Sequence, residues 1–178
     1  MIIDEAYVDF GADSAVQLVD KYDNLLVVQT FSKSRSMAGA RLGYAIAAAE
    51  LIADINRLKY STNPYNVNRM TLAMGVGSLT DDGYFKENCK SIIATREKTL
   101  KELRSLGFTA TDSSANFIFA KHDKISGEEL YLKLKEDGVL VRHFTQERIK
   151  EYNRITVGSP EEMQILVDKI KNIWSDLL

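Results

Sequence analysis

Short apolar runs alternate with helical patterns along the first half of the chain. Residues 25–30 and 41–47 have the composition of short strands, and residues 50–60 have the spacing of a helix. Residues 1–3 are also apolar and are followed by Asp4 and Glu5, a pattern typical of a strand already under way. This alternation predicts an α/β fold, in which helices cover a parallel or mixed sheet.

The second half begins with a long amphipathic pattern. Apolar residues recur at three- and four-residue steps from about residue 80 to Gly107, a residue type that commonly ends a helix. Short strands are expected at residues 109–111, 116–120, 139–144 and 154–157. We therefore divide the chain into residues 1–79, in which strands and helices alternate, and residues 80–178, a long linking helix with a small α+β unit.

Capping signals predict two more helices. Ser126 is followed three residues later by Glu129, and Ser159 by Glu162, which is the spacing of a capping box. The first of these helices is expected to stop at Gly138, and the second to run to the end of the chain. Both belong to the small domain.

The composition argues against several classes of protein. The 178 residues include 25 acidic and 23 basic ones without a basic block, so neither a nucleic-acid surface nor a membrane-binding patch is expected. No apolar stretch reaches the roughly 18 residues that a membrane span needs. One cysteine and two separated histidines argue against disulfides and metal sites. We expect a cytoplasmic protein with Cys89 in the core, His122 in a solvated loop and His143 partly buried at a strand edge.

Polar residues with possible chemistry follow or precede the expected strands. Asp4 ends the first apolar run and Tyr7 comes three residues later, while Ser32 and Lys33 follow the second strand and Arg41 precedes the third. Taken singly, each has an ordinary explanation as a turn residue or a solvated charge. Ligands bind at the carboxyl ends of strands in open α/β sheets, so together these residues indicate one site at a sheet edge.

These motifs resemble those of the fold type I aminotransferases that use pyridoxal 5'-phosphate (PLP), the class I/II group. The matching stretches, in the family's order, are IIDEAYVDF at residues 2–10, TFSKSRSMAGARLGY at 30–44, NPYNVN at 63–68, ANF at 115–117 and RITVG at 154–158. Among members of the group, they are most similar to histidinol-phosphate aminotransferases. The resemblance implies the last part of a PLP-binding large domain, followed by a small C-terminal domain.

The resemblance also implies roles in binding PLP. Asp4 matches the carboxylate that keeps the cofactor's ring nitrogen protonated, and Tyr7 matches the phenol near the ring oxygen. Lys33 matches the amine that joins the cofactor aldehyde and later moves a proton. Ser32 and Arg41 match the groups that hold the phosphate.

Three residues match substrate-binding positions. Arg154 matches the guanidinium that binds a substrate carboxylate, and Arg142 is either a second substrate cation, for a phosphate, or part of a surface salt bridge. Asn116 either lies near the substrate or caps a strand, and Tyr65 either joins a dimer-shared pocket or packs its own loop. The implied reaction moves an amino group from a small-molecule donor, such as histidinol phosphate, to a 2-oxo acid such as 2-oxoglutarate, in a homodimer.

The resemblance further implies an N-terminal half that carries the rest of the PLP pocket. We therefore expect this chain alone to bind PLP weakly or not at all, and to expose the edge of the strand that ends at Asp4. Two alternatives stay open. One is a threonine-phosphate decarboxylase of the same fold, and the other is a non-catalytic interaction domain.

Overall fold

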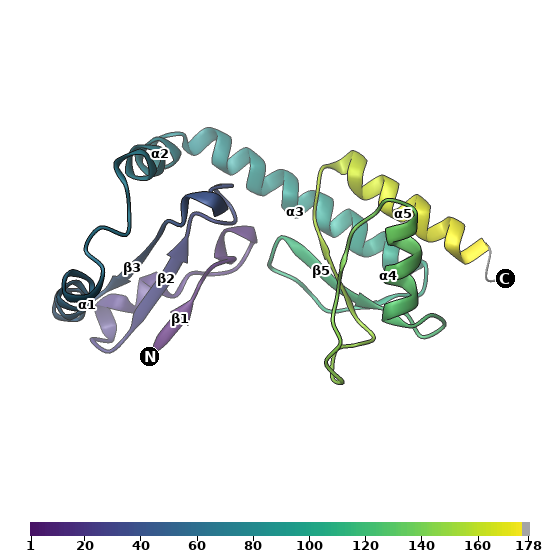
Figure 1. Cartoon of the computed structure of the whole chain (residues 1–178), viewed down its shortest axis with the longest axis horizontal. Coiled ribbons are helices and arrows are strands. Elements are labelled where there is room, and N and C mark those ends of the chain that lie inside the picture. The colour runs from purple at the N-terminus through teal and green to yellow at the C-terminus, as the bar shows by residue number, and fades with distance from the viewer. Residues whose placement is uncertain (176–178) are drawn as a thin grey trace. The chain divides into compact units, whose positions relative to one another are not determined.

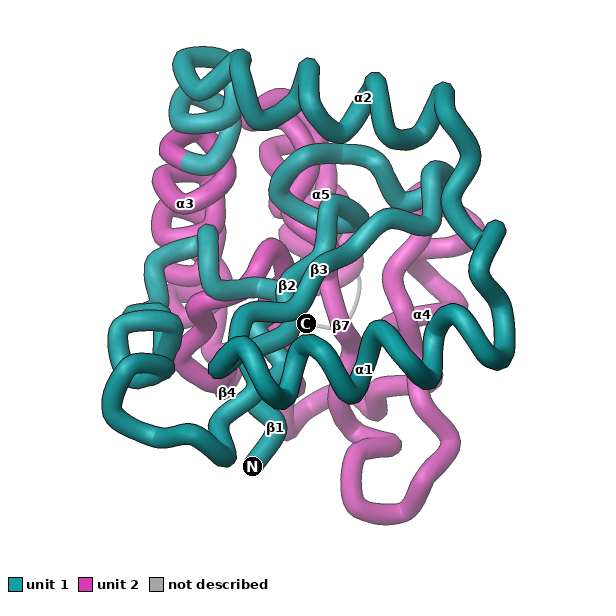
Figure 2. The backbone as a smooth tube through the Cα atoms, turned by 90° about the vertical axis from the view of Figure 1, so that its left-hand side faces the viewer, with its two compact units in different colours: residues 1–89 teal, residues 90–178 magenta. Residues whose placement is uncertain are grey.

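The computed structural model describes residues 1–175 and divides into two compact units, Met1–Cys89 (unit 1) and Lys90–Leu178 (unit 2). Figure 2 shows them in teal and magenta. The division falls inside helix α3 (Asp82–Ser105), the long helix that the sequence predicts. Each unit has its own sheet.

Unit 1 contains a mixed three-stranded sheet (Figure 1). Its strands are β1 (Ile2–Asp4), β2 (Leu26–Thr30) and β3 (Gly43–Ala47), in that spatial order. β1 runs parallel to β2, and β3 runs antiparallel to β2. The three predicted strands are therefore confirmed, and within the described residues β1 is an edge strand, as expected.

The helices of unit 1 are short or lightly buried. They are the 3-10 segments η1 (Val8–Phe10), η2 (Ala15–Lys21) and η3 (Ala38–Ala40), and the α-helices α1 (Ala49–Thr62) and α2 (Arg69–Thr80). The sequence predicts α1 but not α2. Helix α2 lies very close to the segment before β3, since a Cβ on Gly75 would stand 2.6 Å from Leu42 Cδ2. A larger residue at this position would require the Leu42 side chain to shift.

Unit 2 contains an antiparallel sheet in the order β4-β5-β7-β6. The strands are β4 (Thr109–Ala110), β5 (Phe117–Lys121), β6 (Arg142–His143) and β7 (Asn153–Thr156). The prediction of a strand over residues 139–144 is wrong for most of that range, because only Arg142 and His143 pair with β7. The N–H of Val139 instead donates to the carbonyl of Leu134 near the end of helix α4 (Gly127–Glu136).

The capping signals are confirmed in both helices of unit 2 that carry them. Ser126 Oγ accepts from the Glu129 N–H at the start of α4 (Gly127–Glu136). In α5 (Pro160–Ser175), Ser159 Oγ accepts from the Glu162 N–H, and a Glu162 carboxylate oxygen accepts from the Ser159 N–H. Both helix starts are thus satisfied by side chains, as the sequence predicts.

One face of the unit 2 sheet packs on its helices. Ile118 and Ile155 are directly opposite each other in the ladder and are buried with apolar residues of α3, α4 and α5. Side chains alternate across a strand, so Phe117, Phe119 and Arg154 lie on the other face. Those three residues are half-buried.

His122 differs from its expected place in a solvated loop. Its ring is half-buried, and its centroid lies 4.3 Å from that of Trp174 and 5.0 Å from that of Phe108, edge-to-face in both cases. Its Nδ1 accepts a hydrogen bond from the Lys124 N–H. The solvated-loop prediction for His122 is therefore wrong, because α5 brings Trp174 against the ring.

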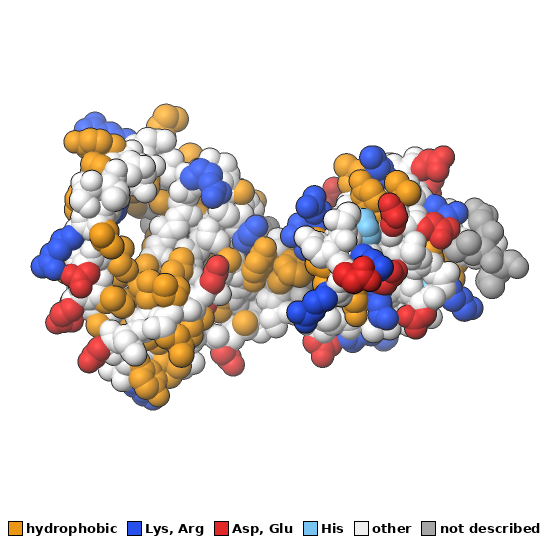
Figure 3. Space-filling model, turned by 60° about the horizontal axis from the view of Figure 1, so that its bottom comes forward, with side chains coloured by type: hydrophobic (Ala, Val, Ile, Leu, Met, Phe, Trp, Pro, Cys, Tyr) orange, Lys and Arg blue, Asp and Glu red, His pale blue; other side chains and the backbone are white. Residues whose placement is uncertain are grey.

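The surfaces of the two units differ. Figure 3 shows hydrophobic side chains gathered on unit 1, whereas charged side chains cover much of the face of unit 2 in that view. Cys89 is buried, as expected. Across residues 1–175, no helix has the length and apolar character needed to cross a membrane.

Candidate active site

Asp4 and Lys33 lie at the same edge of the unit 1 sheet. Asp4 ends β1 and Lys33 follows the end of β2, and these strands are parallel, so their carboxyl ends meet. Lys33 Nζ stands 5.4 Å from the centroid of the Tyr7 ring. The exposed Asp4 carboxylate accepts a hydrogen bond from the Ala6 N–H at 2.9 Å. Sheet topology thus brings Asp4, Tyr7 and Lys33 to one edge.

Arg41 and Ser32 lie at this edge too. β3 runs antiparallel to β2, with Gly43 opposite Thr30, so the residue before β3 comes back to the end of β2. Arg41 has a left-handed backbone, φ 53°, which is costly for a residue other than glycine and is common in functional loops. Its Nη1 donates to the Ala38 carbonyl, and the Ser32 N–H donates to Thr30 Oγ1.

A hydrogen bond that the sequence does not predict joins the Lys33 loop to the turn after Tyr7. Ser34 Oγ donates to a carboxylate oxygen of Asp9 at 2.5 Å, and Ser34 is buried. Since Ser34 is adjacent to Lys33 and Asp9 is two residues from Tyr7, this bond holds the two candidate cofactor groups near each other.

Glu5 anchors the segment that carries Asp4. Its buried carboxylate accepts hydrogen bonds from Ser14 Oγ, the Ala15 N–H and Gln29 Nε2. Burial raises the pKa of Glu5, but these hydrogen bonds outweigh burial and hold the pKa below its ordinary value of 4.5. Glu5 is therefore an anchored carboxylate, and its only signal in the sequence is a charge directly after Asp4.

Gln29 extends this network across the sheet. Its Oε1 accepts from the Tyr44 hydroxyl at 2.5 Å. Burial, followed by the nearby Asp9 carboxylate, raises the pKa of Tyr44 above its ordinary value. Tyr44 therefore stays a protonated donor at neutral pH, and the network links β1, β2 and β3.

The two substrate candidates with guanidinium groups are cross-strand neighbours in unit 2. Arg142 in β6 and Arg154 in β7 are directly opposite each other, and so share one face of the sheet. Within residues 1–175 neither forms an ion pair. Their guanidinium carbons each stand 5.6 Å from an aromatic ring, that of Phe144 for Arg142 and of Phe117 for Arg154.

This arrangement suits an anion. Like charges directly opposite on a sheet repel each other, so anionic groups bound to the two guanidiniums would relieve that repulsion. Arg154 Nε is also buried and has no hydrogen-bond partner within the described residues. Arg142 forms no ion pair within residues 1–175, and its role as a substrate cation stays a prediction.

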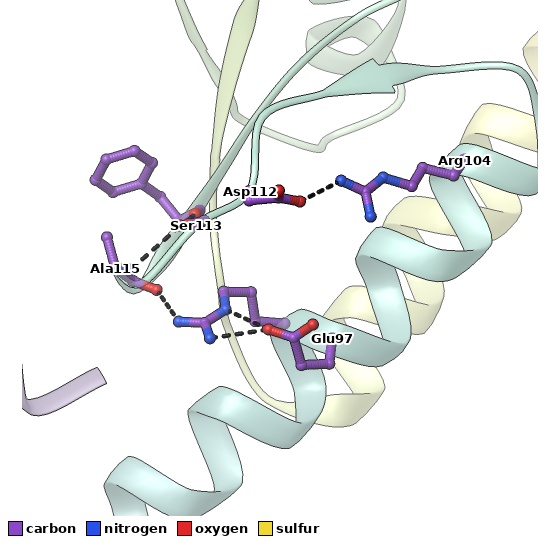
Figure 4. A network of polar contacts seen from close by, with 7 residues as sticks. Glu97, Arg104, Asp112, Ser113 and Ala115 are labelled. Carbon is purple, nitrogen blue, oxygen red and sulfur yellow. Dashed lines mark hydrogen bonds and ion pairs between the residues drawn. The ribbon is translucent and has the colours of Figure 1, made fainter. Parts of the chain in front are cut away.

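Asn116 lies at the start of β5, on a turn that is firmly held. Its carbonyl accepts from the Val157 N–H at 2.9 Å. The neighbouring Ala115 carbonyl accepts from Nη1 of the buried Arg96 of α3, which also pairs with Glu97 (Figure 4). This network, which the sequence does not predict, fixes the backbone that carries Asn116.

The other candidates have simpler surroundings. Tyr65 is 91% exposed, so in this structure it packs on little of its own unit. His143 is half-buried at the sheet edge, as expected, and its ring stacks on Tyr131. No group of histidine, cysteine or carboxylate side chains in residues 1–175 has the arrangement of a metal site.

The sequence model of the family "Aminotransferase class I and II" matches residues 1–170. The chain belongs to this family. A histidinol-phosphate aminotransferase from Brachyspira hyodysenteriae is 53% identical over 174 residues, which are 97% of this chain and 49% of that protein. The chain thus spans about half the length of this relative.

Solved structures show the same fold. The histidinol-phosphate aminotransferase from Clostridium acetobutylicum has a TM-score of 0.88 and 26% identity, over 98% of this chain and 54% of its own. The L-threonine-O-3-phosphate decarboxylase from Porphyromonas gingivalis has a TM-score of 0.78 and 21% identity, over 98% of this chain and 55% of its own. The second likeness concerns the fold alone.

Proposed function

We propose that this chain is part of a PLP-dependent aminotransferase that moves an amino group between histidinol phosphate and 2-oxoglutarate. The observation that carries the proposal is the group of Asp4, Tyr7, Ser32, Lys33 and Arg41 at one edge of the unit 1 sheet. The 53% identity to a histidinol-phosphate aminotransferase supports this substrate over threonine phosphate. It also supports an enzyme over a non-catalytic interaction domain.

The residues at this edge fit PLP. Arg41 and Ser32 supply cationic and hydroxyl donors for a phosphate, and the Asp4 carboxylate at the end of β1 suits a protonated ring nitrogen. When bound, PLP supplies an electron sink for the substrate's Cα. Lys33 would hold the cofactor through its aldehyde and, once released, its Nζ would move a proton; this Nζ stands 5.4 Å from the centroid of the Tyr7 ring.

Unit 2 supplies the residues for the substrate's anionic groups. We assign the carboxylate of the amino acid or 2-oxo acid to Arg154, the phosphate of histidinol phosphate to Arg142, and a polar contact to Asn116. We also assign residues 1–79 to the PLP-binding domain and residues 80–178 to the linking helix and small domain. A homodimer in the cytoplasm completes the proposal.

The test uses the chain co-expressed with the amino-terminal half of the Brachyspira hyodysenteriae relative. We expect transamination of histidinol phosphate with 2-oxoglutarate, its loss in Lys33→Ala, and a raised KM with a smaller change in kcat in Arg154→Lys. The matched control is Lys59→Ala, which removes an exposed lysine of α1 and should leave the rate unchanged. Activity that survives Lys33→Ala, or release of CO₂ from threonine phosphate without transamination, would contradict the proposal.

A further inference from the structure

Arg35 is a half-buried charge, two residues after Lys33, to which the proposed function gives no role. Its Nη1 donates a hydrogen bond to the Ser78 carbonyl at 2.5 Å, and its guanidinium carbon stands 3.9 Å from the centroid of the Phe85 ring. Within residues 1–175 it forms no ion pair with a carboxylate. The guanidinium therefore contacts a carbonyl and an aromatic ring, and both lie in unit 1.

The carbonyl partner lies in the last turn of helix α2. Ser78 is the third residue from the end of that helix, and the carbonyls of a last turn have no partner inside their own helix. A cation at this end also interacts favourably with the helix dipole. Arg35 thus supplies to the end of α2 a donor that the helix itself lacks.

The aromatic partner lies in the first turn of helix α3. Phe85 is half-buried, and a guanidinium over an aromatic ring is attracted to its π-electrons. The two helices meet at Asp81, whose carboxylate accepts a hydrogen bond from the Tyr84 N–H. One side chain of the Lys33 loop therefore contacts both helices at their junction.

The loop that carries Lys33 is closed by its own backbone. The Lys33 carbonyl accepts from the Ser36 N–H at 3.1 Å, and the Phe31 carbonyl accepts from the Met37 N–H at 2.9 Å. Ser36 has a left-handed backbone, φ 54°, which is costly for a residue other than glycine and persists only where surrounding contacts hold it. Arg35, next to Ser36, supplies such contacts.

We propose that Arg35 is a positioning residue for Lys33: it holds the Lys33 loop on the end of α2 and on the Phe85 ring. Ser34 holds the same loop from another side, through its hydrogen bond to Asp9. Consecutive residues after Lys33 are thus fixed to separate segments, which restricts where the Lys33 amine can lie. The proposal rests on the proposed function for the reaction that Lys33 serves.

The first measurement needs neither cofactor nor substrate. Hydrogen exchange of the full chain, followed by mass spectrometry, reports on the amides of Ser36 and Met37, which close the Lys33 loop. We expect these amides to exchange at least about tenfold faster in Arg35→Met, which keeps a long side chain but removes its charge and donors. Arg35→Lys should recover part of the protection, because lysine also donates and also binds an aromatic face. The matched control is Arg57→Met, which changes an exposed arginine of α1 and should leave the loop unchanged.

The second measurement separates positioning from a general loss of structure. It uses the chain co-expressed with the amino-terminal half of the Brachyspira hyodysenteriae relative. Arg35→Met should lower kcat about tenfold and change the KM for histidinol phosphate less than about twofold, because misplacing a catalytic group slows the chemical step. Phe85→Leu should also lower kcat. The double variant should lose no more than the worse single variant, because both changes remove the same contact.

Three results would overturn the inference. The first is unchanged exchange of Ser36 and Met37 in Arg35→Met, and the second is a raised KM with an unchanged kcat. The third is a double variant whose loss is the product of the two single losses, which would mean that Arg35 and Phe85 act separately. A complex without any transamination would contradict the proposed function, whereas exchange in the chain alone would still decide whether Arg35 holds the Lys33 loop.

Discussion

Unit 1 and unit 2 are equal in length but bury their apolar residues very differently. Within residues 1–175, the main cluster of unit 2 holds fourteen buried residues, and that of unit 1 holds three, Val19, Leu25 and Val27. Helix α1 has no buried residue, and α2 buries only Thr71 and Gly75. Thirteen large hydrophobic residues are exposed in unit 1 and three in unit 2.

This difference in buried apolar residues shows that a chain can form regular secondary structure without forming a large hydrophobic core. Unit 1 has its strands, helices and polar contacts in place, yet the apolar residues of α2 do not gather on one face, and Met70, Leu72, Met74, Val76 and Leu79 are exposed. A helix that is hydrophobic all round normally lies inside a protein. Unit 1 thus carries the candidate cofactor residues on a small core, whereas unit 2 has a large core of its own.

The largest expected effect comes from a cavity in the core of unit 2. Leu103 is fully buried, and Leu103→Ala should lower the free energy of unfolding of unit 2 by about 2–5 kcal/mol. The matched change in unit 1 is Leu58→Ala on α1, where the side chain is 65% exposed and the expected change is within about 0.5 kcal/mol. Urea unfolding followed by the fluorescence of Trp174, the only tryptophan, measures the effect of Leu103→Ala. Urea unfolding followed by circular dichroism measures the effect of Leu58→Ala.

The comparison between the units fails if Leu58→Ala proves as destabilising as Leu103→Ala. That result would mean that the α1 surface is covered in solution, for example by a second copy. Sedimentation of both variants over a range of concentrations distinguishes this from a local effect, since only a covered surface gives a concentration-dependent loss.

A smaller effect is expected at the helix caps. Ser159→Ala removes the acceptor for the Glu162 N–H and should cost about 1 kcal/mol, because α5 is docked on the core. Asn68 caps α2 through the Thr71 N–H in the same way. Asn68→Ala should change the global free energy of unfolding less, because α2 can fray without exposing a core. Urea unfolding measures the effect of Ser159→Ala, and hydrogen exchange in α2 measures the effect of Asn68→Ala. An equal loss of global unfolding free energy in the two variants would contradict this order.

Much of this architecture follows from local patterns, and the failures have physical causes. Strands and helices with one apolar face, and helix starts with capping boxes, were predictable because the signal lies within a few residues. Helix α2 is not predicted from the sequence because its own apolar residues are spread around the helix and do not form one periodic apolar face. The strand over residues 139–144 was overpredicted because its apolar run has no partner in this chain.

In the candidate site, too, local sequence predicts the positions of motifs but not the contacts between segments far apart in the sequence. The motif positions of Asp4, Lys33 and Arg41 were predictable, and the parallel and antiparallel ladders explain why they share an edge. The bond from Ser34 to Asp9 was not, because it depends on how two loops far apart in sequence meet. The pairing of Arg142 with Arg154 depends likewise on strand register, which sequence spacing alone does not give.

The smallest expected effect is a pH dependence that belongs to unit 2 alone. Burial against Phe108 and Trp174 lowers the pKa of His122 below its ordinary value of 6.5, although a backbone hydrogen bond at Leu106 and the Asp123 carboxylate act in the opposite direction. As pH falls below about 6.5, the unfolded chain takes up a proton before the folded one does. The stability of unit 2 should therefore be full above this pH and decline as pH falls towards the lower, folded pKa.

Proton NMR measures this directly, because the chain has only two histidines and His143→Gln assigns the remaining signal to His122. The expected result is a His122 titration midpoint below 6.5 in the folded chain, matched by a falling urea midpoint for Trp174 fluorescence over the same range. His122→Phe keeps an aromatic ring against Trp174 and should remove that part of the pH dependence. A His122 midpoint at or above 6.5 would show that the ring is solvated after all, and would place this edge of unit 2 with the loosely covered surfaces of unit 1.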